Sequence, residues 1–189
     1  LVTLSWISAT IFGALPFLFS GVTSSYVDAV FETMSGFTTT GASIIRDVEV
    51  LPQSILFWRS LTHWLGGMGI IVLFITILPN VGTVAMNLFK AEVPGPVSEK
   101  VKPRIQETGR ILWSIYVFIT LLEIVLLVIC GMPFLEAVNN SFATVATGGF
   151  SFRNNSIAGY SPTIQYIIAF FMIISGVNFS LYYFVLKNG

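Results

Sequence analysis

A short polar tract that contains glycine occurs twice in this chain, each time between a short apolar segment and a long one. The first tract is Gly36-Phe37-Thr38-Thr39-Thr40-Gly41-Ala42-Ser43, and the second tract is Val145-Ala146-Thr147-Gly148-Gly149-Phe150-Ser151. The two tracts lie roughly one hundred residues apart, about the length of a helix, loop and helix unit. This duplication predicts that the chain contains two tandem copies of one structural module.

The composition is typical of a membrane protein. Hydrophobic residues make up 54% of the 189 residues and charged residues only 10%, whereas about 25% of the residues in soluble domains are charged. The formal net charge is zero, so no long-range field favours a nucleic-acid partner. The single cysteine, Cys130, excludes an internal disulfide and a multi-thiolate metal site, and we expect it to be a small buried apolar residue.

Four apolar stretches are long enough to cross a bilayer, which takes about 20 residues of helix. Two other segments, residues 26–36 and 133–145, are too short to span and are interpreted as re-entrant pore helices. The predicted fold is therefore an all-α membrane protein with tandem repeats, each made of an outer helix, a pore helix, a filter loop and an inner helix. The predicted spans are residues 1–20, 54–78, 111–132 and 163–186.

The predicted repeats are separated by a connector. Residues 1–78 form the first repeat, with a filter at 38–42, and residues 111–189 form the second, with a filter at 146–149. Since basic residues concentrate in cytoplasmic loops, we expect the connector, residues 79–110, in the cytoplasm and the filters near the outer face of the membrane. The basic residues of the connector are Lys90, Lys100, Lys102, Arg104 and Arg110.

Both tracts resemble a potassium filter. A dehydrated monovalent cation needs a ring of oxygens, and backbone carbonyls supply one where glycine and threonine leave the chain extended and unobstructed. An ordinary Thr/Gly turn at the membrane surface is the alternative, and the duplication argues against it. The main-chain oxygens expected to face K⁺ are those of Thr39, Thr40, Gly41 and Ala42, and of Ala146, Thr147, Gly148 and Gly149.

The sequence leaves the register between the two tracts open by one residue. Matching Asp28 with Glu136, near the start of each pore helix, pairs Gly41 with Gly149. Aligning the two Thr-Gly dipeptides pairs Gly41 with Gly148 instead.

Charged residues in and around the pore helices have two interpretations. Asp28 is expected to complement the dipole at the start of its helix. Glu32 lies deeper in the same helix, and it either plays a similar role or ties down the filter loop, with Arg46 as its partner.

Polar residues within the predicted spans also allow two interpretations each. Glu123 lies mid-span, where a carboxylate marks either a functional site or a structural hydrogen bond between helices, and we favour the structural role. His63, the only histidine, is expected to have a packing role near the outer membrane boundary. The run from Gly66 to Gly69 favours close helix approach or a bend over a gating hinge. Asn178 either lines an inner cavity or bonds between helices.

Four separated stretches resemble the Trk/Ktr/HKT superfamily of potassium transporters, and most closely the Trk-type membrane subunit. They occur in the family's order and cover essentially the whole chain: residues 31–42, 59–70, 89–96 and 141–151.

The resemblance implies a subunit with four such repeats around one pore, of which this chain holds two. It also implies potassium uptake across the bacterial inner membrane by a multi-pass protein, with K⁺ as the transported ion and no organic cofactor. The implied partners are the remaining repeats of the same polypeptide, a second copy in a homodimer, a cytoplasmic nucleotide-binding regulatory subunit and the lipid membrane.

Two other classes of function fit less well. An intramembrane enzyme would need His63, Cys130 or Glu123 as catalytic groups, but these lie on different predicted segments without the spacing of a triad or of paired ligands. A non-conducting membrane scaffold has no reason to place glycine-rich loops at membrane depth. We therefore predict a channel-like transporter subunit without enzymatic activity.

Overall fold

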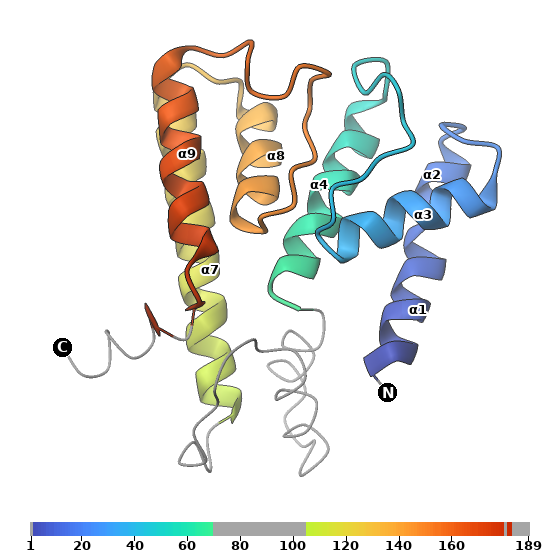
Figure 1. The fold of residues 1–189 in the computed structure, drawn as a ribbon, viewed down its shortest axis with the longest axis horizontal. Coiled ribbons are helices and arrows are strands. Elements are labelled where there is room, and N and C mark those ends of the chain that lie inside the picture. Colours follow the sequence, from blue (N-terminus) through green and yellow to red (C-terminus); the bar gives the residue numbers. More distant parts are fainter. Residues whose placement is uncertain (1, 70–104, 180, 183–189) are drawn as a thin grey trace.

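The computed structural model describes residues 2–69, 105–179, 181 and 182. These residues form helices and loops without any strand, which confirms the predicted all-α class for this part of the chain (Figure 1). The helices are α1 (Val2–Gly13), α2 (Leu15–Phe19), α3 (Tyr26–Phe37), α4 (Gln53–Gly67), α7 (Ile105–Ile129), α8 (Phe134–Val145) and α9 (Pro162–Gly176).

Local sequence explains several helix ends. The hydroxyl of Ser25 accepts a hydrogen bond from the Asp28 amide at 3.3 Å and caps α3. Helices α8 and α9 start beside Pro133 and Pro162, whose fixed φ suits a first helical turn. The first predicted span is not continuous: it divides at Ala14 into α1 and α2, because Pro16 cannot donate the helical hydrogen bond at that point.

The two halves of the chain have the same helix order. In the first half, α1 and α2 together are followed by α3 and then by α4 (Figure 1). In the second half, α7 is followed by α8 and then by α9. Helix α4 packs against both short helices, α3 of its own half and α8 of the other. The inner helix of the first repeat is therefore the element that joins the two repeats.

Glycines at the end of α4 allow this double contact. A Cβ on Gly66 would overlap the carbonyl oxygen of Phe37 at the end of α3, and a Cβ on Gly67 would lie 2.8 Å from the Cα of Ala146 at the end of α8. The glycine run thus serves close helix approach. Helix α4 ends at Gly67, and the predicted continuation to residue 78 and most of the connector, residues 79–104, lie outside the described residues.

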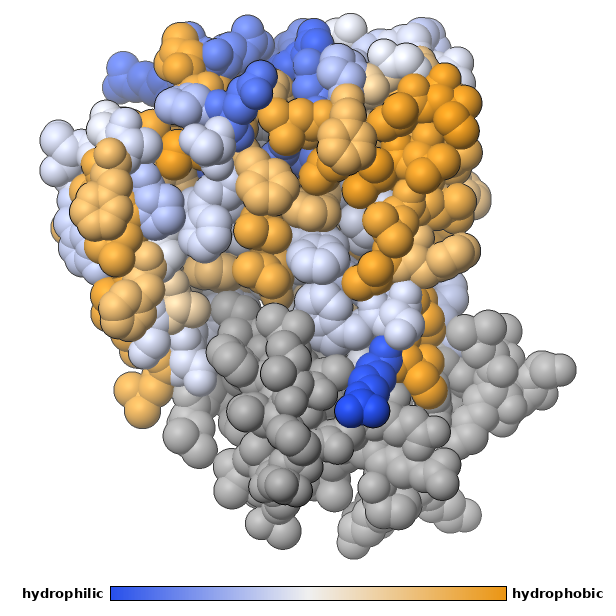
Figure 2. Space-filling view, turned by 180° about the vertical axis from the view of Figure 1, so that it is seen from behind, coloured by the Kyte–Doolittle hydropathy of each residue, from blue (hydrophilic) through white to orange (hydrophobic). Residues whose placement is uncertain are grey.

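The exterior of the second half is apolar. Within the described part of the chain, Gly109–Ile129 is the segment long and apolar enough to cross a membrane, and Thr3–Phe19 and Pro162–Gly176 are shorter apolar helices. Figure 2 shows apolar side chains gathered over the side formed by α7 and α9, and hydrophilic residues at the end where the loops lie. Exposed apolar residues on these two helices include Phe118, Leu121, Val125, Ile129, Phe170 and Ile173.

Replacing Gly66 with alanine should destabilise the protein. The added Cβ meets backbone atoms of Phe37 and not a movable side chain, so α4 must shift away from α3, at a cost of about 1–3 kcal/mol. Gly176→Ala is the matched control, because a Cβ at that helical glycine meets nothing within 4 Å. The thermal unfolding midpoints of the two full-length variants in detergent test this, and equal midpoints would contradict the proposed close contact.

Candidate functional site

The first tract begins where α3 ends in a specific hydrogen-bonded turn. Thr39 has a φ of 53°, a left-handed conformation that is unusual for a β-branched residue. Its amide donates to the carbonyl of Gly36 at 3.0 Å, and the amide of Thr40 donates to the carbonyl of Ser35 at 3.0 Å. This pair of bonds defines a Schellman motif, in which glycine usually holds the left-handed position.

The second tract begins in the same way at the end of α8. Thr147 also has a φ of 53°. Its amide donates to the carbonyl of Thr144 at 2.9 Å, and the amide of Gly148 donates to the carbonyl of Ala143 at 2.8 Å. Two separate segments therefore have a threonine in a strained left-handed conformation at the equivalent position of the turn. Such backbone strain is common at functional sites.

This shared geometry decides the register that the sequence left open. Gly41 and Gly149, each two residues after the left-handed threonine, have φ values of 74° and 89°. Gly41 therefore corresponds to Gly149, and the pairing with Gly148 is wrong. In this register the counterparts of Thr39–Ala42 are residues 147–150, and Ala146 corresponds to Thr38, the last cap residue of its helix.

The two tracts lie against each other. A Cβ on Gly41 would overlap the carbonyl oxygen of Gly148 and would lie 3.9 Å from the Cα of Gly149. Glycine is thus required at position 41 both by the positive φ of this residue and by the backbone of the second tract beside it. The structure thus brings Gly41 of the first tract beside Gly148 and Gly149 of the second.

Both short helices direct their carboxyl ends at this junction. The carboxyl end of a helix carries a partial negative charge, which favours a nearby cation. The amides of Thr40 and Gly148 bond back to these helices, and the Ser35 hydroxyl donates to the carbonyl of Ala42 at 2.5 Å. The carbonyl of Ala42 is therefore partly engaged by α3.

A buried ion pair ties down the far end of the first tract. Glu32 accepts hydrogen bonds from the Ser43 hydroxyl at 2.9 Å, from the Ile44 amide at 3.1 Å and from the Arg59 Nε at 2.9 Å. The side chains of Glu32 and Arg59 are only 1% and 2% exposed. Glu32 thus holds the end of the first tract, and its partner is Arg59 of α4; the possible partner Arg46 is wrong.

Phe150 of the second tract inserts into the first repeat. The Arg59 guanidinium carbon lies 4.2 Å from the centroid of its ring, and the His63 ring stacks on it at 4.0 Å. A Cβ on Gly36 would lie 3.5 Å from the same ring. We call these three residues, Gly36, Arg59 and His63, the Phe150 socket. His63 is completely buried there, so its packing role is against Phe150 of the second tract.

A second polar cluster holds the loop of the second repeat. Arg153 forms an ion pair with Glu136 at 3.0 Å, and the Tyr160 hydroxyl donates to the same carboxylate. Burial first, and then the bond to Glu136, raise the pKa of the Tyr160 hydroxyl, so it donates as a neutral group. The bond to Glu136 also raises the pKa of Arg153.

The two loops that follow the tracts are bonded to each other. The Asn154 side chain accepts from the Val48 amide at 2.9 Å and donates to the Asp47 carboxylate at 2.7 Å. The backbone amide of Asn154 donates to the Glu49 carboxylate at 3.1 Å. These bonds fix the second loop on the first at the polar end of the molecule.

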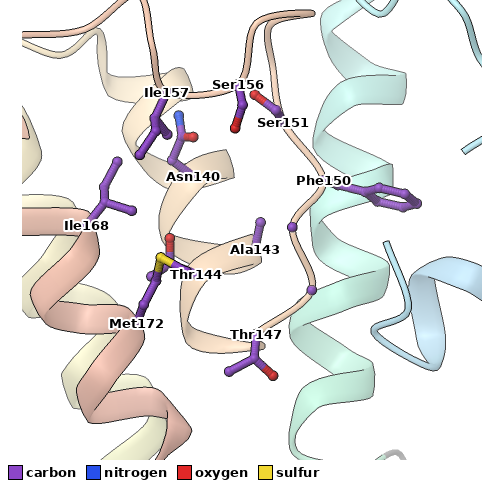
Figure 3. Close-up of a pocket in the computed structure, with 12 residues that line it drawn as sticks. Asn140, Ala143, Thr144, Thr147, Phe150, Ser151, Ser156, Ile157, Ile168 and Met172 are labelled. Atoms are coloured by element: carbon purple, nitrogen blue, oxygen red, sulfur yellow. The ribbon is translucent and has the colours of Figure 1, made fainter. Parts of the chain in front are cut away.

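A cavity of about 320 Å³ lies on the other side of the second tract, between that tract and helices α8 and α9 (Figure 3). Its walls include Thr147, Gly148, Gly149, Ile168 and Met172. Figure 3 shows that the Phe150 side chain points away from this cavity. One face of the second tract is therefore packed against the first repeat, and the other borders open space.

The remaining polar candidates do not join the site. Glu123 is completely buried on α7 and lies beside the Thr144 side chain of α8, and its predicted bonding role between helices stays a prediction. Asn178 follows the end of α9, and its carbonyl accepts from the Leu181 amide. Cys130 is a half-buried free thiol beside a hydrophobic cluster.

Sequence reasoning missed the roles of Arg59, Phe150 and Asn154. A signal was present for Arg59, since a charged residue within an apolar span requires a partner. The roles of Phe150 and Asn154 depend on contacts between the repeats, for which the sequence carries no local pattern.

Comparisons with known proteins identify what the chain is similar to. The family model described as TrkH, cation transport protein, matches residues 1–188. A Trk system potassium uptake protein TrkH from Salmonella typhimurium is 46% identical over 191 residues, and one from Escherichia coli K12 is 47% identical over 191 residues. A crystal structure of the potassium transporter TrkH from Vibrio parahaemolyticus matches with a TM-score of 0.79 and 38% identity.

These matches include all of this chain but only part of each relative. The chain covers 40% of the Salmonella and Escherichia proteins and 37% of the Vibrio chain. The resemblance to the Trk-type membrane subunit is confirmed.

Replacing Glu32 with glutamine should destabilise the protein far more than the same change at Glu136. Glu32→Gln leaves Arg59 buried without a counter-charge, which costs about 3–5 kcal/mol. The side chains of Glu136 and Arg153 are 15% and 38% exposed, and a pair so open to solvent contributes about 0–1 kcal/mol. Denaturant titration of the full-length variants in detergent measures both free energies of unfolding. Equal losses would contradict the anchoring role of the buried pair.

Proposed function

This chain belongs to the TrkH cation transport protein family, and on that premise we propose that it forms two neighbouring pore repeats of a potassium uptake protein. The curated relatives are named potassium uptake proteins. The proposed location is the bacterial inner membrane, which the longer protein crosses several times. Potassium is the transported ion, and the chain has no enzymatic role.

One observation carries this proposal: two separate tracts adopt the same unusual backbone conformation and lie side by side. Thr39 and Thr147 share a φ of 53°, and Gly41 lies against the carbonyl of Gly148. A turn at the membrane surface has no need for a matched neighbour. A pore whose wall is built from equivalent repeats does need neighbouring tracts with the same conformation.

In the proposed mechanism, backbone carbonyls replace the water that a potassium ion loses. The oxygens of residues 39–41 and 147–149 form this part of the ion path, with Ala42 and Ala146 at its margins. Each pore helix directs its negative end at the ion, and the Schellman turns hold the amides of Thr40 and Gly148 away from it. These two N–H groups, which would repel a cation, are therefore bonded to helix carbonyls instead of facing the ion path.

The length of the relatives, of which the chain covers 40%, supports the remaining repeats as partners, and the family resemblance supports the homodimer and the regulatory subunit. The rest of the polypeptide supplies the other quarters of the pore, and two such subunits form a homodimer in the lipid membrane. A cytoplasmic nucleotide-binding subunit regulates the pore. A non-conducting membrane scaffold is the competing proposal, and ion flux separates the two.

Replacing Gly41 with serine should reduce ion selectivity. A side chain at this position collides with the Gly148 carbonyl and also strains the backbone. The full-length protein in liposomes should take up rubidium or potassium in preference to sodium. In Gly41→Ser this preference should fall by about tenfold or more, which corresponds to about 1.4 kcal/mol.

Gly21→Ser is the matched control. Gly21 has a φ of 72°, close to the 74° of Gly41, but a Cβ there meets nothing within 4 Å. Both variants thus carry the same backbone strain, and only one of them disturbs the tract. Retained selectivity in Gly41→Ser, or an equal loss in both variants, would contradict the proposed filter, and absence of flux in the unmodified protein would favour the scaffold.

A further inference from the structure

The short helices support the two tracts in different ways. In the first repeat, the Ser35 hydroxyl of α3 donates to the Ala42 carbonyl at 2.5 Å. Glu32 of the same helix accepts from the Ser43 hydroxyl at 2.9 Å and from the Ile44 amide at 3.1 Å. The first tract is therefore fixed by side chains of its own repeat.

The short helix of the second repeat has different residues at these two places. In the register set by the Schellman turns, Ser35 of the first repeat corresponds to Ala143. Glu32, three residues earlier, corresponds to Asn140. Ala143 has no polar side chain, and the Asn140 side-chain amide donates to the Glu136 carbonyl within α8 at 2.8 Å. Support for the second tract therefore has to come from another element.

His63 of α4 supplies that support from the other repeat. Its Nδ1 atom accepts a hydrogen bond from the Phe150 amide at 3.5 Å, and its ring stacks on the Phe150 ring. Figure 3 shows the Phe150 side chain extending from the second tract to α4. Phe150 corresponds to Ala42, the residue that Ser35 holds in the first repeat. The same position is thus fixed in both tracts, by a different helix in each.

The identity of residue 148 gives an independent indication that His63 shapes the second tract. Gly148 corresponds to Thr40 in the first tract, so a side chain is tolerated at this point of the turn. Gly148 also lacks the positive φ of Gly41 and Gly149. A Cβ on Gly148 would nevertheless overlap the His63 Nδ1 and would lie 2.6 Å from its Cε1. Glycine is therefore required at position 148 by the imidazole ring beside it.

The bond to Phe150 also determines the protonation state of the ring. Nδ1 accepts a hydrogen bond only when it carries no proton, so the one N–H group of the neutral imidazole is at Nε2. A protonated ring would lose this acceptor. It would also place a second cation beside the Arg59 guanidinium, which lies 4.2 Å from the same Phe150 ring. The ring that supports the second tract is therefore neutral.

We propose that His63 is a positioning residue that sets the ion specificity of the second tract. By accepting the Phe150 amide, the neutral imidazole keeps this N–H group out of the ion path. It also holds the adjacent carbonyls of Gly148 and Gly149 in the arrangement that favours K⁺ over Na⁺. The inference rests on the proposed function, since it requires the second tract to line an ion path.

Two substitutions of equal shape separate the acceptor from the packing of the ring. Asparagine places an oxygen where histidine has Nδ1, and leucine places a methyl group there. In liposomes, His63→Leu should lower the preference of the full-length protein for rubidium or potassium over sodium by about two- to tenfold, the range that one net hydrogen bond contributes. His63→Asn, which also lacks the ring but keeps the acceptor, should recover most of this preference.

Hydrogen exchange at the Phe150 amide gives a second readout, which is independent of ion flux. Mass spectrometry with fragmentation of the exchanged peptide measures this amide in detergent. Exchange should be slow in the unmodified protein and in His63→Asn, and roughly tenfold faster in His63→Leu. The Val48 amide is the internal control, because it bonds to Asn154 at 2.9 Å and should exchange equally in all three proteins.

The outcomes separate this inference from the proposed function. Equal losses of selectivity in both variants would assign the effect to the ring and overturn the acceptor role. Unchanged selectivity, or unchanged exchange at the Phe150 amide, in His63→Leu would also overturn the inference. An unmodified protein without any preference for potassium refutes the proposed function, whereas a selective unmodified protein beside an equally selective His63→Leu refutes the role of His63 alone.

Discussion

Removing an ion from water costs several kcal/mol, and in this fold one carboxylate and one guanidinium are removed together. Glu32 and Arg59 come from α3 and α4, and they share the hydroxyl of Ser43 at the end of the first tract. Neither charge has access to solvent, so α3, the first tract and α4 hold one relative position. The face of Arg59 that remains is covered by Phe150. Through this one pair, the position of the first tract depends on the second.

The two repeats reach one backbone conformation with different side chains. Both short helices end in the same Schellman turn with a left-handed threonine, which is a property of main-chain hydrogen bonds. The supporting polar groups differ: the first repeat uses the buried pair of Glu32 and Arg59, and the second uses Glu136 with Arg153 and Tyr160 nearer the surface. The backbone of the tracts is thus the common element, and the side chains around it adapt to different neighbours.

The sequence predicted the helical class and the proximity of the tracts, because apolar segmentation and a duplicated motif are local patterns. It left the pairing of Gly41 open, since Gly148 and Gly149 are adjacent and only their φ angles and hydrogen bonds distinguish them. It offered Arg46 as a partner of Glu32 in one of two interpretations, whereas packing of α4 against α3 brings Arg59 to the carboxylate. The packing role expected of His63 has its partner in the other repeat, because the His63 ring stacks on Phe150.

The insertion of Phe150 into the first repeat also sets an order of assembly during synthesis. Phe150 is added to the growing chain about ninety residues after Arg59. Until it arrives, the guanidinium of Arg59 and the ring of His63 lack the aromatic face that covers them in the folded protein. The packing of the first repeat is therefore complete only after the second repeat has been synthesised.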